Sequence, residues 1–239
     1  MGKFDRVELL LGSQGLQKLK KANVLLFGVG GVGGFTAEAL VRSGVGSITL
    51  VDNDVVNETN INRQIIATVQ SVGLSKVEVM KARLNAINPE VKVDTLNLFY
   101  LPENADTIDF SAFDYVIDAV DTVSAKIAVI ERAKEQGVPV ISCMGTGGKL
   151  NPELLTVGDI ANTKGCPLAR VMRRELKKRN ITGVKVVYST EESVQVSLDN
   201  PLSEEKGKGR VAPPSMIFVP AIAGLMMANQ VVLDIVKGK

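Results

Sequence analysis

The chain has 239 residues, of which 45% are hydrophobic and 23% charged, and its formal net charge is +2. These values are ordinary for a soluble globular protein and exclude the disordered and collagen-like classes. The length suffices for one large α/β domain with ample core. Because the sequence has no histidine, the commonest general base is excluded. Any catalysis must therefore use carboxylates, lysine, arginine or cysteine.

Cysteine usage and hydropathy indicate the compartment. Cys143 and Cys166 lie far apart without CxxC spacing, which predicts neither a disulfide framework nor a zinc site and favours a cytoplasmic protein. The N-terminus lacks the apolar run of a signal peptide. Residues 216–236 are long and apolar enough for a membrane span but include Pro220 and Asp234. We therefore expect a buried C-terminal helix and no stable membrane insertion.

Short β-branched runs alternate with amphipathic stretches through the first 148 residues. Strands are expected at 23–28, 47–52, 91–98, 115–120 and 138–145, and helices between them, from about 32 to 43, from 75 to 88 and over the stretch before Gly137. Ser75 and Glu78 have the spacing of a capping box at the start of the second helix. The alternation predicts an α/β, Rossmann-like fold with a mostly parallel sheet flanked by helices.

The pattern loosens after Gly148. Residues 154–160 and 184–190 are expected to form a smaller C-terminal sheet, with a helix over about 167–179 and a helical extension at the C-terminus. Residues 197–215 are rich in proline, glycine and charge and predict a long loop. We treat the chain as one domain, with a nucleotide-binding core at 1–148 and a substrate or dimer region at 149–239.

A glycine-rich motif follows the first expected strand. Gly28, Gly30 and Gly33 give GxGxxG, which permits a tight turn and close approach of backbone to phosphate at a helix N-terminus. Asp52 ends the next strand at the distance expected of a carboxylate that binds ribose hydroxyls. A purely structural glycine turn is the alternative, and the acid at this spacing favours nucleotide binding.

The segment after Asp52 differs from that of a nicotinamide enzyme. It concentrates polar side chains in one loop before the next helix: Asp54, Asn60, Arg63, Gln64 and Lys76. An arginine and a lysine near a glycine-rich turn suit a triphosphate, whose charge must be neutralised as pyrophosphate leaves. The alternative is that both cations are ordinary surface charges.

Asp118 and Asp121 come at the end of the expected strand 115–120, where ligands of open α/β sheets bind. A carboxylate there can hold Mg²⁺ against phosphate oxygens. We assign the metal to Asp121 and a supporting or capping role to Asp118. The alternative is that one of the two only caps the following helix.

Four segments together resemble the ubiquitin-activating-enzyme superfamily that includes ThiF and MoeB: GVGGVG, DNDVVNETNINRQ, GLSKVEVMKARLNAINP and DYVIDAVDTVSAK. The resemblance spans residues 4–142 and implies adenylation of a carboxylate with ATP and Mg²⁺. It implies that Gly30 and Asp52 hold the nucleotide, that Asn60, Arg63 and Lys76 contact its ribose and phosphates, and that Asp121 carries magnesium. FDRVELLLG resembles the superfamily's N-terminal arm, which implies a homodimer in which Arg6 reaches the partner's phosphates.

Within the superfamily, residues 145–179 and 213–232 resemble the tRNA threonylcarbamoyladenosine dehydratases, and the two CxxC pairs usual in sulfur-carrier activators are absent. This resemblance implies cyclisation of N6-threonylcarbamoyladenosine in tRNA through a carboxyl-adenylate. Alternatives are an activator of a ubiquitin-like sulfur-carrier protein, a non-catalytic nucleotide-binding partner and, last, a nicotinamide oxidoreductase. A monovalent cation and a sulfur-relay partner protein stay open.

The expected helix at 167–179 carries a cluster of cations, for which we predict contacts with tRNA phosphates: Arg170, Arg173, Arg174, Lys177 and Lys178. The alternative is a solvated helix face. Cys166 precedes this helix as either a plain loop thiol or an acceptor of an acyl group or sulfur. We favour the plain thiol, since ring closure within one molecule needs positioning more than a protein nucleophile.

Overall fold

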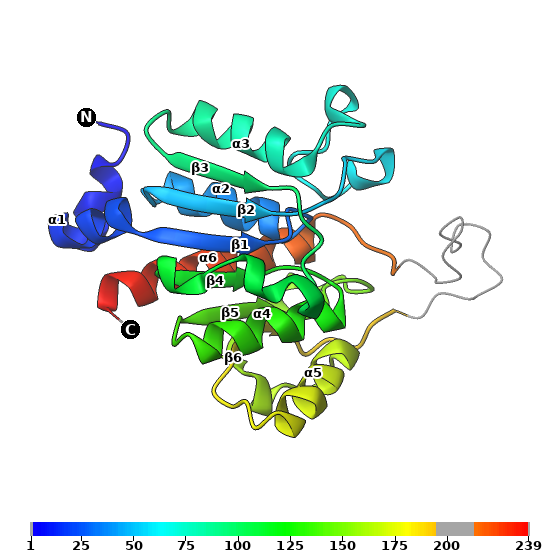
Figure 1. Ribbon diagram of the computed structural model, residues 1–239. Helices are drawn as coiled ribbons and strands as arrows, with labels where there is room; N and C mark the ends of the chain where they lie inside the picture. The colour runs from blue at the N-terminus through cyan, green and yellow to red at the C-terminus, as the bar shows by residue number, and fades with distance from the viewer. Residues whose placement is uncertain (1, 195–212, 239) are drawn as a thin grey trace.

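The computed structural model describes residues 2–194 and 213–238. Seven strands form one twisted sheet in the order β3-β2-β1-β4-β5-β7-β6 (Figure 1). The strands are β1 (Asn23–Phe27), β2 (Ser47–Val51), β3 (Lys92–Leu96), β4 (Tyr115–Asp118), β5 (Val140–Cys143), β6 (Leu155–Asp159) and β7 (Lys185–Ser189). All pair in parallel except β6, which runs antiparallel to β7 at the edge. The predicted α/β fold with a mostly parallel sheet is confirmed.

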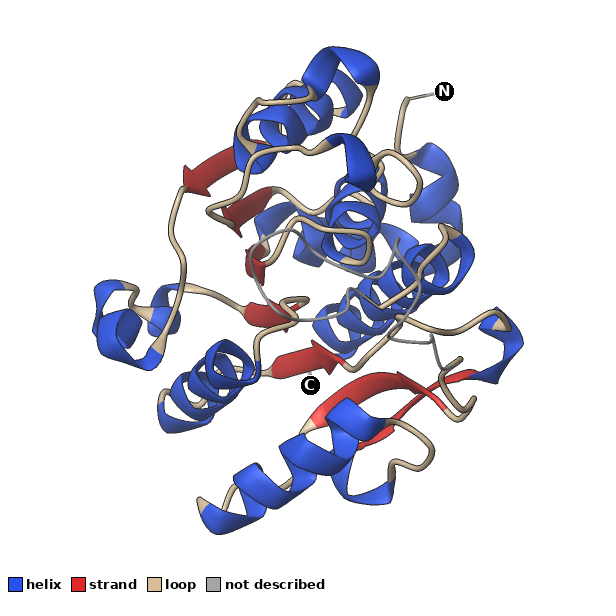
Figure 2. Ribbon diagram, turned by 90° about the vertical axis from the view of Figure 1, so that its right-hand side faces the viewer, coloured by secondary structure: helices blue, strands red, loops and turns tan. Residues whose placement is uncertain are grey.

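Helices cover both faces of the sheet (Figure 2). The α-helices are α1 (Asp5–Lys21), α2 (Gly33–Arg42), α3 (Lys76–Ile87), α4 (Val123–Glu135), α5 (Pro167–Lys178) and α6 (Phe218–Lys237). Short 3₁₀ helices are η1 (Glu58–Asn60), η2 (Val69–Ser71), η3 (Pro102–Thr107), η4 (Phe110–Ala112), η5 (Pro152–Leu154) and η6 (Ile160–Asn162). The expected helices therefore form within two residues of their predicted bounds, as is usual for helix ends.

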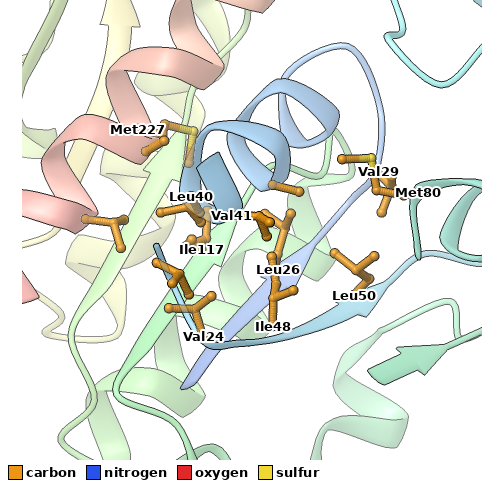
Figure 3. Packing of buried hydrophobic residues seen from close by; sticks show 14 of the residues in the cluster. Val24, Leu26, Val29, Leu40, Val41, Ile48, Leu50, Met80, Ile117 and Met227 are labelled. Atoms are coloured by element: carbon orange, nitrogen blue, oxygen red, sulfur yellow. The ribbon is translucent and has the colours of Figure 1, made fainter. Parts of the chain in front are cut away.

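Alternate residues of each central strand enter two separate cores, because side chains of a strand point to opposite faces in turn. In β1, Val24 and Leu26 join a core with α2, α3 and α6, shown in Figure 3. Leu25 and Phe27 join the other core, with α4 and α5. A sheet buried on both faces explains why its central strands have unbroken hydrophobic runs.

The two late strands differ from the expectation of a smaller, separate sheet. They form as predicted, but β7 pairs in parallel with β5, with Ile141 opposite Lys185, and β6 then pairs with β7. The physical reason is that α5 packs on the same face as α4, so the chain returns through it as an ordinary parallel crossover. The sheet of the first 148 residues and the later strands are thus continuous.

The predicted capping box at α3 is wrong in detail. Ser75 occupies the N-cap, but its side chain makes no capping hydrogen bond. Glu78 instead accepts a hydrogen bond of 2.7 Å from the Thr95 hydroxyl on β3. The backbone amide of Lys76 donates to the Asp54 carbonyl at 3.0 Å, so tertiary contacts satisfy this helix end in place of the local cap.

The C-terminal helix α6 is long and apolar enough to cross a membrane, but 56% of its most apolar stretch is buried inside the protein. It packs closely on α2, where the Thr36 hydroxyl donates to the Gly224 carbonyl at 3.1 Å. Asp234 of α6 is buried and accepts hydrogen bonds from Tyr115, at 2.7 Å, and from Lys185. Burial alone raises the pKa of Asp234, but these bonds outweigh burial and hold the pKa below its ordinary value. The expected buried helix is confirmed.

Of the expected loop at 197–215, residues 197–212 lie outside the described residues.

Candidate active site

The strand order reverses between β1 and β4, since the chain proceeds outward from β1 through β2 and β3 and then returns to β4. Open α/β sheets bind ligands at the carboxyl edge beside such a reversal. The glycine-rich turn after β1 and the loop after β4 lie there side by side, because the Ala119 amide donates to the Phe27 carbonyl at 2.8 Å. The sequence motifs for nucleotide and metal therefore lie next to each other at the carboxyl edge of the sheet, at the position called the crevice in open α/β sheets.

Glycine is needed for a different reason at each of the three motif positions. Gly28 has φ +88°, and a Cβ there would lie 2.8 Å from the Ala119 carbonyl oxygen. A Cβ at Gly33 would lie 1.8 Å from the Gly28 carbonyl oxygen, so this glycine permits α2 to start against the turn. At Gly30 the nearest atom to a Cβ would be Gln64 Nε2, at 3.9 Å. The protein's own packing leaves Gly30 unexplained, which fits close approach of a ligand.

Asp52 ties the glycine-rich turn to the loop after β2. Its two carboxylate oxygens accept hydrogen bonds from the Val29 amide at 2.7 Å and the Asp54 amide at 2.9 Å. Burial raises the pKa of Asp52, partly offset by the positive charge of Lys76. The carboxylate predicted to hold ribose hydroxyls is therefore already oriented by the backbone.

The η1 turn presents the predicted polar residues to the glycine-rich turn. Asn60 is buried, and its side-chain oxygen accepts from the Asn57 amide at 3.0 Å, which fixes the turn. A Cβ on Gly31 would lie 3.4 Å from Arg63 Cγ, so Arg63 lies against the turn. Gln64 is buried, and its Oε1 has no hydrogen-bond partner among residues 2–194 and 213–238. Such an unsatisfied buried oxygen suits a ligand that donates a hydrogen bond.

Lys76 and Asp54 form an ion pair of 2.7 Å between a buried ammonium and an exposed carboxylate. Lys76 also lies close enough to Asp52 to lower its pKa, so all three groups share one electrostatic environment. Asp52, Asp54 and Lys76, three of the predicted site residues, are thus brought together. Lys76 at the start of α3 is buried beside these carboxylates. The alternative that Lys76 is an ordinary surface charge requires a solvated side chain and is therefore wrong.

Asp118 and Asp121 lie in different environments. Asp118 is fully buried and forms a 2.9 Å ion pair with Lys126, so it supports the loop and does not face a ligand. Asp121 is exposed, and its only side-chain hydrogen bond within the described residues is accepted from the Thr122 hydroxyl at 3.5 Å. Neither carboxylate caps α4, whose N-cap Thr122 makes no capping bond either. Asp121 therefore has no structural task that competes with metal binding.

Among the described residues, no three acidic, cysteine or histidine side chains come together as a ready metal cage. A single carboxylate is nevertheless sufficient for Mg²⁺ that also binds substrate phosphates and keeps several waters. Asp121 at the crevice beside the glycine-rich turn fits that description.

Arg6 lies away from the crevice of its own chain. The neighbouring Phe4 packs near Gly44, just before β2 begins, so this part of α1 sits at the amino edge of the sheet. Figure 1 shows α1 at the opposite end of the strands from the loops of the crevice. Arg6 is exposed and makes no hydrogen bond within the described residues. It can therefore act on a nucleotide only in another copy of the chain.

The basic helix α5 packs against α4, whose N-terminus follows the Asp121 loop. A groove of about 510 Å³ runs between the two helices, and Val123, Ser124 and Arg174 are among its lining residues. It begins two residues beyond Asp121. Arg174 of the basic cluster, whose position sequence alone left undetermined, thus shares a groove with the helix that follows the Asp121 loop.

The charges of that helix are not equally available. Arg173 is turned inward and donates to the carbonyl and hydroxyl of Thr163. Arg174 and Lys178 pair with Glu175 at 3.2 and 3.0 Å, and hydrogen bonds from Lys178 and Arg179 lower the Glu175 pKa to about 2. Arg170 and Lys177 are exposed and make no side-chain bond within the described part of the chain. The geometry therefore leaves these two as the better candidates for phosphate contacts.

Both cysteines are buried. Burial raises the pKa of Cys143 to about 12, which makes its thiolate inaccessible at neutral pH. Cys166 is the N-cap residue of α5, and its side chain packs near Gly145. The description of Cys166 as a plain loop thiol needs correction, since the thiol is 4% exposed and belongs to the core.

One feature of the site was missed from sequence, namely the buried Lys126. It lies in the stripe of α4 that faces the core, where the pattern predicts apolar residues. A lysine at such a position, five residues after the candidate metal ligand and eight after Asp118, was the available signal.

Comparison with known proteins agrees with this geometry. Residues 4–238 match the ThiF family. The chain belongs to the ThiF family. Within it, the chain is 43% identical to the tRNA threonylcarbamoyladenosine dehydratase of Bacillus subtilis, over 98% of this chain and 94% of that protein. It is 39% identical to the dehydratase of Escherichia coli, over 82% of this chain and 76% of that protein.

Solved structures in the ThiF family include the E. coli enzyme, TcdA, in complex with AMP, which superposes with a TM-score of 0.88 at 34% identity. That alignment covers 99% of this chain and 94% of TcdA. The same enzyme in complex with ATP gives a TM-score of 0.86. The fold around the crevice is therefore that of a protein known to hold adenine nucleotides.

Proposed function

We propose that this protein catalyses ATP-dependent dehydration of N6-threonylcarbamoyladenosine in tRNA. The observation that carries the proposal is the near full-length similarity to tRNA threonylcarbamoyladenosine dehydratases. The crevice supports it independently, because Gly30 leaves room for phosphate and Gln64 has an unsatisfied oxygen. Nicotinamide chemistry does not require the cations beside this turn.

The first step is adenylation of the threonine carboxylate. That carboxylate is ionised at neutral pH, so it attacks the α-phosphorus of ATP without a general base. A carboxyl oxygen–phosphorus bond forms, the bond to the β-phosphate bridging oxygen breaks, and pyrophosphate leaves. The absence of histidine from the chain is no obstacle to this route.

The residues around the crevice orient ATP for this attack. Asp52 and Asn60 are held by backbone hydrogen bonds and would bind the ribose, while Arg63 and Lys76 would neutralise charge on the phosphates. Asp121 would hold Mg²⁺, which when bound withdraws negative charge from the phosphate oxygens. Preorganised groups of this kind stabilise the leaving pyrophosphate because they need little rearrangement.

The second step closes a ring. An atom of the same modified side chain attacks the activated carbonyl carbon and forms the ring, while the carbon–oxygen bond to AMP breaks. The side chain releases one proton to solvent and AMP carries away one carboxyl oxygen, so the protonated nucleoside loses the elements of one water overall. Because both partners belong to one molecule, positioning replaces a protein nucleophile. The burial of both cysteines agrees with this step.

We further propose a cytoplasmic homodimer in which Arg6 of each chain reaches the nucleotide of the other. Its exposed position at the amino edge of the sheet, with no ion pair to any residue that the structure describes, supports this role. Residues 1–148 would then serve as nucleotide-binding core, and residues 149–239 would contact tRNA, through Arg170 and Lys177, and the partner chain. The roles of a sulfur-relay partner protein and of a monovalent cation can be tested by adding each to the assay below and measuring turnover.

The test is mass spectrometry of nucleosides from tRNA carrying threonylcarbamoyladenosine, after incubation with the protein, ATP and Mg²⁺. We expect ATP-dependent loss of one water, abolished by Asp121→Ala. Asp109→Asn is a matched control, because Asp109 is an exposed carboxylate that only caps η4 and asparagine caps equally well. If the protein binds ATP but the nucleoside mass stays unchanged, the proposal is contradicted. Pyrophosphate release triggered by a ubiquitin-like carrier instead of tRNA would replace it with carrier activation.

A further inference from the structure

We propose that Lys126 is a positioning residue that fixes the loop of Asp121 against the glycine-rich turn, and thereby determines how well Asp121 holds Mg²⁺ on ATP. The inference rests on the proposed function, because it concerns the metal used in adenylation. Lys126 itself does not reach the substrate, since its side chain is completely buried.

The Lys126 ammonium connects the ends of two neighbouring strands. It donates to the Val120 carbonyl at 3.1 Å, two residues after β4, and to the Cys143 carbonyl at 2.7 Å, the last residue of β5. It also forms the 2.9 Å ion pair with Asp118. The ammonium thus makes two backbone hydrogen bonds, and its charge is paired with one buried carboxylate. The Val120 contact is one residue from Asp121.

Asp118 completes the same network from the other side. One carboxylate oxygen accepts from the Val120 amide at 3.2 Å, and the other accepts from the Ser142 hydroxyl at 2.5 Å. Both the amide and the carbonyl of Val120 are therefore held by one buried ion pair. The peptide that leads into Asp121 has little freedom to move.

The held loop is also in contact with the nucleotide-binding turn. The backbone of Ala119 closely abuts Gly28, where a Cβ would lie 2.8 Å from the Ala119 oxygen. The Ala119 side chain would lie 3.3 Å from a Cβ on Gly33. Lys126 thus locks Asp121 in a fixed relation to the turn that carries the phosphates.

A purely structural role explains this network less well. Taking two charges out of water is costly, and a buried ion pair is frequently no more stabilising than apolar residues of similar volume. The apolar neighbours of Lys126 on α4, Ile127 and Ile130, show that this face readily packs with aliphatic residues. A charged pair here gains directional bonds to one loop, which apolar packing does not supply. Groups that orient a metal ligand in this way typically change metal affinity 10- to 100-fold when lost.

The experiment compares affinity for a non-hydrolysable ATP analogue with Mg²⁺ and with EDTA, by calorimetry, so that no turnover is needed. The variant is the double substitution Lys126→Met and Asp118→Asn, which removes both charges together and leaves no unpaired ion. Lys134→Met is the matched control, because Lys134 lies on the same helix and donates to the Gly183 carbonyl at the surface. Circular dichroism and size exclusion verify folding.

We expect Mg²⁺ to increase wild-type and Lys134→Met affinity equally, and the double variant to lose about tenfold or more of that increase. Its affinity in EDTA should stay within about twofold of wild type, because Gly30 and Asp52 do not depend on Lys126. An unchanged Mg²⁺ effect in the folded double variant overturns the inference, as does an equal loss of affinity in EDTA. Lack of any Mg²⁺ effect in wild type would instead contradict the proposed function. If the double variant fails to fold, Lys126→Arg is measured by the same criteria, because a longer cation displaces the Val120 carbonyl.

Discussion

Two single-methyl substitutions in the glycine-rich turn separate folding from nucleotide binding. At Gly33, alanine would place Cβ 1.8 Å from the Gly28 carbonyl oxygen, whereas real Cβ atoms essentially never approach within 3.0 Å. The start of α2 must therefore retreat by about 1 Å from a turn that packs on Ala119. Overpacking of this kind costs about 1–3 kcal/mol or more.

At Gly30, alanine meets nothing nearer than Gln64 Nε2 at 3.9 Å, and the backbone there is not left-handed. The substitution should leave folding unchanged or stabilise it by up to about 1 kcal/mol, because alanine reduces the freedom of the unfolded chain. Its methyl group would occupy the approach of the phosphates, so we expect about a tenfold or greater loss of ATP affinity, equal to about 1.4 kcal/mol.

The assay is urea unfolding followed by circular dichroism, combined with ATP titration by calorimetry. Gly33→Ala should lower the unfolding midpoint, and Gly30→Ala should lower only ATP affinity. Wild-type ATP affinity in folded Gly30→Ala would refute the reasoning, because the phosphates would then not approach that residue. Unchanged stability of Gly33→Ala would show that the turn adapts without cost.

Three further predictions concern other parts of the molecule. The pKa of Asp234 is depressed in the folded state, so its contribution to stability is present above the ordinary value of 3.8 and is lost as pH falls through the lower folded pKa. Asp234→Asn should therefore destabilise the protein at pH 7 by about 1–3 kcal/mol, and the urea midpoints of variant and wild type should converge only as the pH falls from 3.8 through the folded pKa of Asp234; a difference that stays constant over this range would exclude the linkage. Replacing both Arg170 and Lys177 with glutamate should weaken tRNA binding and flatten its salt dependence. Unchanged tRNA binding would mean that both residues are only solvated surface charges. Cys166→Ser should retain dehydration, measured by nucleoside mass spectrometry, because the thiol is core packing; loss of turnover in folded protein would assign it a chemical role.

The elements with strong local signals were predictable from the sequence. Central strands such as β1 are buried on both faces, so they have continuous apolar runs that stand out without knowledge of their partners. The GxGxxG turn and Asp52 are set by short-range geometry between one strand and the next helix. Their close approach could therefore be inferred from spacing alone.

Pairing between distant segments was not predictable in the same way. The place of β7 beside β5 depends on α5 packing on the same face as α4, which no local pattern specifies. The Ser75 capping box failed for a related reason, since Glu78 found a partner on β3. Local rules give candidate contacts, and competition with tertiary contacts selects among them.

The sequence by itself determined the α/β fold class, the nucleotide turn and the set of polar residues around it, because each follows from a local pattern with a fixed geometric consequence. The tertiary structure decided how those residues divide their tasks. It buried Asp118 with Lys126 and left Asp121 exposed, and it turned Arg173 inward while Arg170 stayed exposed. The physical reason is that solvation and the available partners fix the role of a charged side chain, and both depend on chain segments far apart in sequence.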